Sequence, residues 1–155
     1  MRDVSLLISV VGMTTIKHSD RGFSSDRMRR VVVALMLLEA LSLAVISGLH
    51  LSGVIAGGTK PYNPQAAGIA EAVIGVVLVA GAVMAMRSPA RGRTAAMAAT
   101  AFAIVGFLVG LGFTISGGQP TDVAYHATVL PLLVLTLALS VRWTGARGRS
   151  GHAHA

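Results

Sequence analysis

Residues 31–55 read VVVALMLLEALSLAVISGLHLSGVI, and this apolar run decides the fold class. It holds 14 Leu, Val, Ile and Met residues between Val31 and Val54, and one acid, Glu39. At roughly −0.4 kcal/mol each, these apolar side chains outweigh one central acid at roughly +3 kcal/mol when the segment enters a bilayer. A helix needs about 20 residues to cross the hydrocarbon core. The run therefore predicts a membrane-spanning helix.

Three further apolar runs are long enough to span a bilayer, at residues 66–86, 95–116 and 122–141. The segments between the four runs, AGGTKPYNPQ, RSPARGR and GGQPT, carry glycine and proline, which break helices. Short connections make consecutive helices run in opposite directions beside each other. We expect an all-α, integral-membrane, up-down four-helix bundle, with residues 31–141 as one transmembrane domain.

Small residues recur at helical spacing in two of these runs. Gly68, Ala72 and Gly75 form a ridge in the second run, and Gly106 and Gly110 form a GxxxG pair in the third. Small side chains allow the backbones of membrane helices to approach closely. The pattern predicts compact packing and says little about dimerisation.

Composition supports the membrane prediction and excludes other classes. Hydrophobic residues make up 54% of the chain and charged residues 12%, and the mean hydropathy is +0.72. A soluble domain averages about 25% charged residues, so this chain lacks the polar surface of a soluble protein. The net charge of +7 lies in short flanks, and with only 5% aromatic residues we expect a lipid bilayer as partner and no nucleic acid. The absence of cysteine excludes disulfides and thiolate metal sites.

The basic residues predict the orientation in the membrane. Arginines flank one end of every run, at Arg27, Arg29, Arg30, Arg87, Arg91, Arg93, Arg142, Arg147 and Arg149. The two loops at the other end contain a single basic residue, Lys60. Because Lys and Arg collect on the cytoplasmic side, we expect both termini to be cytoplasmic.

The two ends of the chain lie outside the predicted bundle. Residues 1–30 are expected to be a disordered extension, or to result from translation assigned to Met1 where Met28 is the true start. The apolar stretch VSLLISVVGM in this segment has about ten residues and is too short to span. Residues 142–155 are expected to form a basic cytoplasmic tail.

Polar residues inside the runs gather toward one end of the predicted bundle. Counted from the flanking arginines at 1.5 Å per residue, Glu39 lies about 13 Å up and His50 about 30 Å up. Glu71 and His126 each lie about 24 Å up by the same count. Glu39 and His50 share a helix face with Leu43 and Ile46, so this face is expected to point inward.

Two interpretations of these polar residues stay open. In the first, His50, Asp122, Tyr125 and His126 are interfacial residues wetted by headgroup water. In the second, they form a cofactor or ion site: His50 and His126 bind haem iron, or the two histidines and Glu71 bind a divalent metal. Asp122 lies four residues before His126 on the same helix face, so its side chain is expected to orient that imidazole.

Glu39 suggests another class of function. A lone acid in the sequence LLEAL, in the first helix of a four-helix protein of this size, resembles small multidrug-resistance transporters. The resemblance implies that Glu39 exchanges protons for cationic substrates. The alternative is a protonated Glu39 that hydrogen-bonds to Ser or Thr on a neighbouring helix.

The polar landmarks also suggest a family. The stretches EALSLAVISGLHLSG, GIAEAVIGVVLVAGAV, AFAIVGFLVG and DVAYHATVLPLLVLTLAL resemble a group of small uncharacterised bacterial integral membrane proteins with four helices. The resemblance covers about residues 28–142 and implies location in the bacterial inner membrane and this topology.

No activity follows from that resemblance, and no Walker loop, catalytic triad or metalloprotease motif is present in the sequence. We expect no enzyme but a small accessory or scaffold protein, acting in a larger membrane complex or a homo-oligomer. Haem or metal binding and proton-coupled transport are the alternatives.

Overall fold

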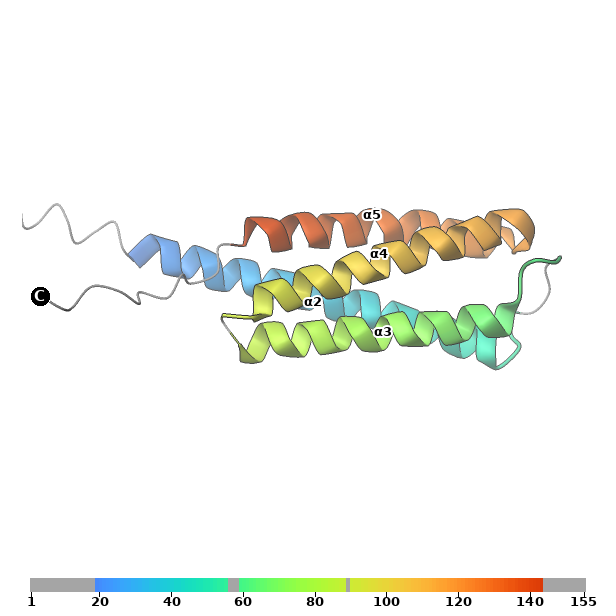
Figure 1. Ribbon diagram of the computed structural model, residues 1–155, viewed down its shortest axis with the longest axis horizontal. Helices are drawn as coiled ribbons and strands as arrows, with labels where there is room; N and C mark the ends of the chain where they lie inside the picture. Colours follow the sequence, from blue (N-terminus) through green and yellow to red (C-terminus); the bar gives the residue numbers. More distant parts are fainter. Residues whose placement is uncertain (1–18, 56–58, 89, 144–155) are drawn as a thin grey trace, which may run out of the picture.

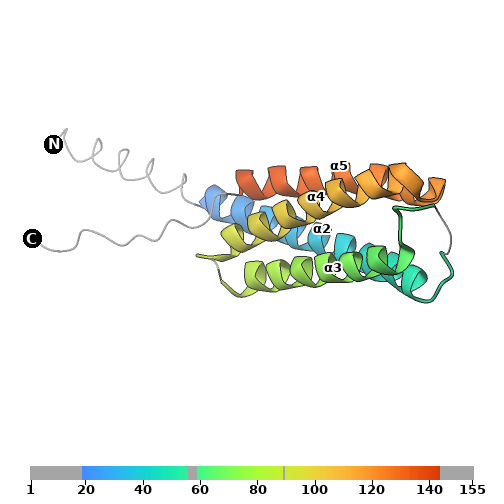
Figure 2. The same ribbon diagram turned by 45° about the vertical axis from the view of Figure 1, so that its right-hand side comes forward.

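Four long helices make up the fold. The computed structural model describes residues 19–55, 59–88 and 90–143, and within these ranges the chain forms four α-helices and no strand. They are α2 (Ser19–Leu51), α3 (Pro64–Arg87), α4 (Gly92–Gly117) and α5 (Pro120–Arg142). Figures 1 and 2 show them side by side along the long axis of the molecule. Each is long and apolar enough to cross a membrane, so the all-α membrane class predicted from the sequence agrees with the structure.

The first helix differs most from its predicted range of 31–55. It begins twelve residues earlier, at Ser19, so residues 19–30 of the segment expected to be a disordered extension or a wrongly assigned start are helical, and residues 1–18 lie outside the described part. An ion pair of 3.2 Å between Asp26 and Arg29, one turn apart, supports this extension. The helix ends at Leu51 because the chain then turns at Gly53, whose φ of +76° favours glycine. The predicted spans 66–86, 95–116 and 122–141 lie within α3, α4 and α5.

Proline and a capping side chain fix where α3 and α5 begin. Asn63 precedes α3, and its Oδ1 accepts hydrogen bonds from the backbone N–H groups of Gln65 and Ala66. Pro64 and Pro120 occupy the first positions of α3 and α5, where a missing N–H costs nothing. Asp122 lies in the first turn of α5, near the positive end of the helix dipole.

Hydrogen bonds at the two ends of the bundle show which helix ends lie next to each other. The backbone N–H of Thr59, before α3, donates to the carbonyl of Gly117, at the end of α4, over 2.8 Å. Arg93, at the start of α4, donates to the carbonyls of Ser140 and Val141, at the end of α5. We call the second region, with Arg87, Arg91, Arg93 and Arg142, the arginine end, and the first, where α3 and α5 begin, the opposite end.

Apolar side chains cover the outside of the bundle as well as its core. The fully buried core includes Met36, Leu43, Leu78 and Leu133. Large apolar side chains on all four helices are nevertheless about half exposed or more, including Leu41, Val76, Val105, Ile115 and Val134. A water-facing bundle would place polar residues there, so this surface is that of a multi-pass membrane protein.

The small residues predicted to permit close packing lie at helix contacts. A Cβ on Gly68 would come 3.0 Å from the Cβ of His50 on α2, and a Cβ on Gly106 would come 2.6 Å from Cδ1 of Ile74 on α3. A Cβ on Gly110 would come 2.9 Å from Nε2 of His126 on α5. These glycines therefore bring the helices that carry the polar residues into contact.

Candidate functional site

Four buried polar side chains from four segments meet at the opposite end of the bundle. They are His50 from the last turn of α2, Tyr62 from the connection before α3, Glu71 from α3 and Asp122 from α5. Each is at most 8% exposed. We call these four residues the His50 network.

His50 is the centre of this network. Its Nδ1 lies 2.8 Å from Oε2 of Glu71, and its Nε2 lies 3.0 Å from the hydroxyl of Tyr62. The Tyr62 hydroxyl donates to Oδ2 of Asp122 over 2.7 Å, and Oδ1 of Asp122 lies 3.6 Å from Nε2 of His50. Both ring nitrogens of His50 are therefore engaged by protein groups.

The hydrogen bonds determine where the protons lie. A tyrosine hydroxyl has one proton, and that of Tyr62 goes to Asp122. Nε2 of His50 must therefore carry a proton and donate it to the Tyr62 oxygen. The contact between Nδ1 of His50 and Oε2 of Glu71 holds one further proton, which is bound either to the nitrogen or to the oxygen.

Tyr62 stays protonated in this setting. Its burial raises the pKa of the Tyr62 hydroxyl well above the ordinary value, and the hydrogen bond to Asp122 and the negative charges of Asp122 and Glu71 raise it further. The hydroxyl therefore acts as a stable bridge between His50 and Asp122.

His126 lies beside the network and is oriented differently from the sequence prediction. Its Nδ1–H donates to the backbone carbonyl of Asp122 over 2.8 Å, four residues back on α5. The Asp122 side chain was expected to make this contact, but it bonds to Tyr62. The His126 ring packs against Phe107 with ring centroids 5.1 Å apart, and its Nε2 lies next to Gly110.

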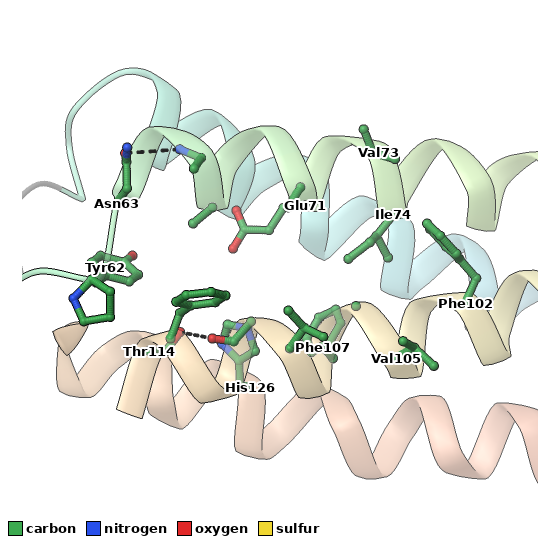
Figure 3. A pocket seen from close by; sticks show the side chains of 18 residues that line it. Tyr62, Asn63, Glu71, Val73, Ile74, Phe102, Val105, Phe107, Thr114 and His126 are labelled. Atoms are coloured by element: carbon green, nitrogen blue, oxygen red, sulfur yellow. Dashed lines mark hydrogen bonds between the residues drawn. The ribbon is translucent and has the colours of Figure 1, made fainter. Parts of the chain in front are cut away.

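A pocket of about 520 Å³ opens between α3 and α4 beside this network. Its wall is largely apolar, and its polar lining residues are Tyr62, Asn63, Glu71, Thr114 and His126. Figure 3 shows the Glu71 carboxylate pointing from α3 into the space toward α4. Although Glu71 is only 6% exposed, its Oε1 has no hydrogen-bond partner.

Apolar side chains that face away from the bundle form the mouth of the pocket. Val73, Phe102, Val105, Val109 and Phe113 all line it, and each is between 46% and 60% exposed. Phe107, deeper in the wall, is 2% exposed. The pocket therefore opens sideways, toward the surface that lipid would cover.

The metal and haem hypotheses gain no support from this geometry. Among residues 19–55, 59–88 and 90–143, no group of three or more His, Cys, Asp or Glu side chains is placed to hold a metal ion. Both nitrogens of His50 are hydrogen-bonded, so this ring offers no free lone pair to a metal. Of the three proposed metal ligands, His50 and Glu71 are in contact, whereas the ring of His126 packs against Phe107.

The two histidines and Asp122 are buried among protein groups, where the interfacial interpretation expected side chains wetted by headgroup water. His50 is 4%, Asp122 3% and His126 8% exposed, and their hydrogen-bond partners are protein groups. Tyr125 is half-buried, and its hydroxyl lies 3.1 Å from Oγ of Ser42 on α2. The helices close over these residues because glycines at their contacts leave room.

Glu39 occupies a separate, closed site nearer the middle of α2. It is 1% exposed, and Oγ1 of Thr136 on α5 donates to its Oε1 over 2.7 Å. This is the hydrogen bond to a threonine on a neighbouring helix that the sequence suggested. Glu39 is not part of the pocket lining. The inward face expected for Glu39, Leu43, Ile46 and His50 is confirmed for the three that are buried, Glu39, Leu43 and His50, whereas Ile46 is half-buried.

Sequence reasoning missed Tyr62. It lies in a connection rich in glycine and proline, where helical periodicity gives no information. Its residue type was the available signal, because the chain has only two tyrosines and a buried tyrosine hydroxyl needs a polar partner. Both tyrosines bond to polar side chains of other segments.

Comparison with known proteins adds no assignment: no family model, no curated protein and no solved structure matches this chain.

Proposed function

We propose that this chain is a four-span protein of a bacterial plasma membrane that binds an amphipathic small molecule in the pocket between α3 and α4. The observation that carries the proposal is the side chain of Glu71, which lines this pocket and whose buried Oε1 has no hydrogen-bond partner. An unpaired buried carboxylate oxygen is costly, and a ligand that donates a hydrogen bond to it removes that cost.

The shape of the pocket supports a ligand with one polar head and an apolar body. Most of its wall is apolar, with three phenylalanines, whereas Glu71, His126 and Tyr62 lie together. Ligand sites commonly combine an apolar wall with few polar groups that orient the ligand. The sideways mouth lets such a molecule enter from the lipid phase.

The topology proposed with this function is up-down, with both termini in the cytoplasm. The arginines at one end and the single Lys60 at the other favour it. The His50 network and the pocket then lie toward the outer leaflet. The richness in Ala, Gly, Val and Arg fits a bacterial source with a GC-rich genome.

Cysteine labelling tests the orientation, since the chain has no cysteine of its own. Gln65→Cys and Thr121→Cys place an exposed thiol at the opposite end, and Ser88→Cys places a partly exposed thiol at the arginine end. On intact cells, a membrane-impermeant maleimide should label the first two and spare the third. Labelling of Ser88→Cys alone contradicts the orientation.

Saturable binding of a probe tests the pocket. Phenylbutanol and phenylbutylamine each carry a hydrogen-bond donor on an apolar body, and calorimetric titration into the protein in lipid nanodiscs, with empty nanodiscs subtracted, measures their binding. We expect at least one to bind saturably. Ala70 is an exposed residue of the pocket lining, so Ala70→Phe should fill the pocket and abolish binding.

Ala80→Phe is the matched control, because Ala80 is equally an exposed alanine on α3 and lies outside this pocket. It should bind as the unchanged protein does. If neither probe binds saturably, or if the two variants behave alike, the pocket is no ligand site. The accessory or scaffold role expected from the sequence then becomes the better proposal.

A further inference from the structure

The His50 network contains two carboxyl groups, those of Glu71 and Asp122, but only one imidazole. Glu71 contacts Nδ1 of His50, and Asp122 lies near Nε2 and accepts from Tyr62. When both carboxyl groups are ionised, a single imidazolium balances only one of them, and one negative charge is left over.

No basic side chain compensates this charge. In the described part of the chain, neither Glu71 nor Asp122 forms an ion pair with a lysine or arginine, and histidine is their only basic partner. Lys60 is the nearest basic residue in sequence, two positions before Tyr62, but it is exposed. The start of α5 stabilises Asp122 through the helix dipole, by about 1 kcal/mol or less at an ordinary helix end. A buried net charge in a membrane protein costs more than that.

The pocket gives an external charge a route to the Glu71 side chain, which lines it. Oε1 of Glu71 is buried and unpaired, while Oε2 of the same carboxylate is already bonded to His50. A cation at Oε1 favours the arrangement in which Glu71 is ionised and the proton sits on His50. The phenylalanine faces along the pocket also attract cations.

We propose that the ligand of this pocket is an amphipathic organic cation, whose ammonium group pairs with Glu71 and whose apolar body lies along the phenylalanines of α4. The inference rests on the proposed ligand-binding function and adds the charge of the ligand. Zwitterionic and anionic lipids are disfavoured as occupants because their phosphates would face a network that is already negative.

A proton competes with this cation for the network. One additional proton neutralises the network as an ammonium group would, so acidification should weaken cation binding. The titratable groups facing Glu71 are His50 from α2, Tyr62 from the connection, and Asp122, Tyr125 and His126 from α5. The residues of α4 in the pocket wall include none that titrates.

Three probes with one apolar body separate charge from shape: phenylbutylamine is a cation, phenylbutanol a neutral donor and phenylbutyrate an anion. In calorimetric titrations of nanodiscs near neutral pH, the amine should bind at least about tenfold more tightly than the alcohol, since both donate a hydrogen bond to the carboxylate but only the ammonium adds Coulomb attraction. Phenylbutyrate should show no saturable binding. Lowering the pH from about 8 to about 5 should weaken the binding of the amine more than that of the alcohol, because a hydroxyl can also accept from a protonated carboxyl whereas an ammonium cannot.

Glu71→Gln removes the charge and keeps the shape, so the amine should lose its advantage over the alcohol. If this variant does not fold, the three-probe comparison on the unchanged protein still decides. An alcohol that binds as tightly as the amine overturns the cation inference and leaves the ligand-binding function standing. Absence of binding by both probes overturns the function itself, so the two failures are distinguishable.

Discussion

Glu71 and Glu39 are two buried carboxyl groups in one bundle, and each keeps one oxygen without a hydrogen-bond partner. Glu71 contacts a histidine that also bonds to Tyr62, and its side chain lines a pocket. Glu39 contacts one threonine and is closed in by the core. A buried glutamate thus occurs once in a hydrogen-bonded network beside a pocket and once in a single hydrogen bond to a threonine. The adjoining pocket and the number of linked polar groups, more than burial, distinguish a candidate site from a structural acid.

The largest expected effect comes from removing the centre of the network. His50→Ala leaves both Glu71 and Asp122 without their basic partner, and breaking a buried charge pair costs about 3–5 kcal/mol in the free energy of unfolding. Thr136→Val removes one hydroxyl that donates to Glu39 and should cost about 1–3 kcal/mol. Reversible unfolding in mixed micelles measures both. Equal losses would show that the two regions are energetically alike.

The two tyrosines make a matched pair across the same two regions. Tyr62→Phe deprives Asp122 and His50 of their bridge and should cost about 1–3 kcal/mol in the free energy of unfolding. Tyr125→Phe should cost less, because its partner Ser42 already donates to the backbone carbonyl of Glu39 over 2.8 Å. Thermal unfolding of the two variants side by side measures the difference. A larger loss for Tyr125→Phe would contradict the assigned roles.

The sequence was sufficient to predict the helices, because a hydrophobic run of span length has few structural alternatives in a membrane. It also predicted that His50, Glu71 and His126 lie toward the same end, since depth follows from the rise per residue. The rotation of α3 and α5 about their axes did not follow, so the pairing of His50 with Glu71 and the position of His126 had to come from the structure. The Asp122 side chain bonds to Tyr62 and not to His126. The sequence did not predict this contact, because Tyr62 lies in a connection without helical periodicity.

Close approach of α4 and α5 at the pocket provides a smaller test. A Cβ on Gly110 would lie 2.9 Å from Nε2 of His126, whose ring is held by Asp122 and Phe107. Gly110→Ala should therefore cost about 1–3 kcal/mol in the free energy of unfolding, as overpacking does. Gly112→Ala, on the same helix with nothing within 4 Å, should be neutral or stabilise by up to about 1 kcal/mol. If the two variants shift the thermal midpoint equally, the close contact at His126 is not tight.

The smallest expected effect is that of Glu39→Gln. The amide oxygen of glutamine can still accept from Thr136, and its NH₂ group replaces the oxygen that now has no partner, so the free energy of unfolding should change by less than about 1 kcal/mol. Phenylbutylamine binding should also stay within about twofold, because distant sites without shared partners act independently. Calorimetric titration of Glu39→Gln beside Glu71→Gln measures this contrast. If Glu39→Gln removed amine binding while Glu71→Gln kept it, the roles of the two acids would be exchanged. Proton-coupled transport through Glu39 would then replace cation binding at Glu71 as the better account of this bundle.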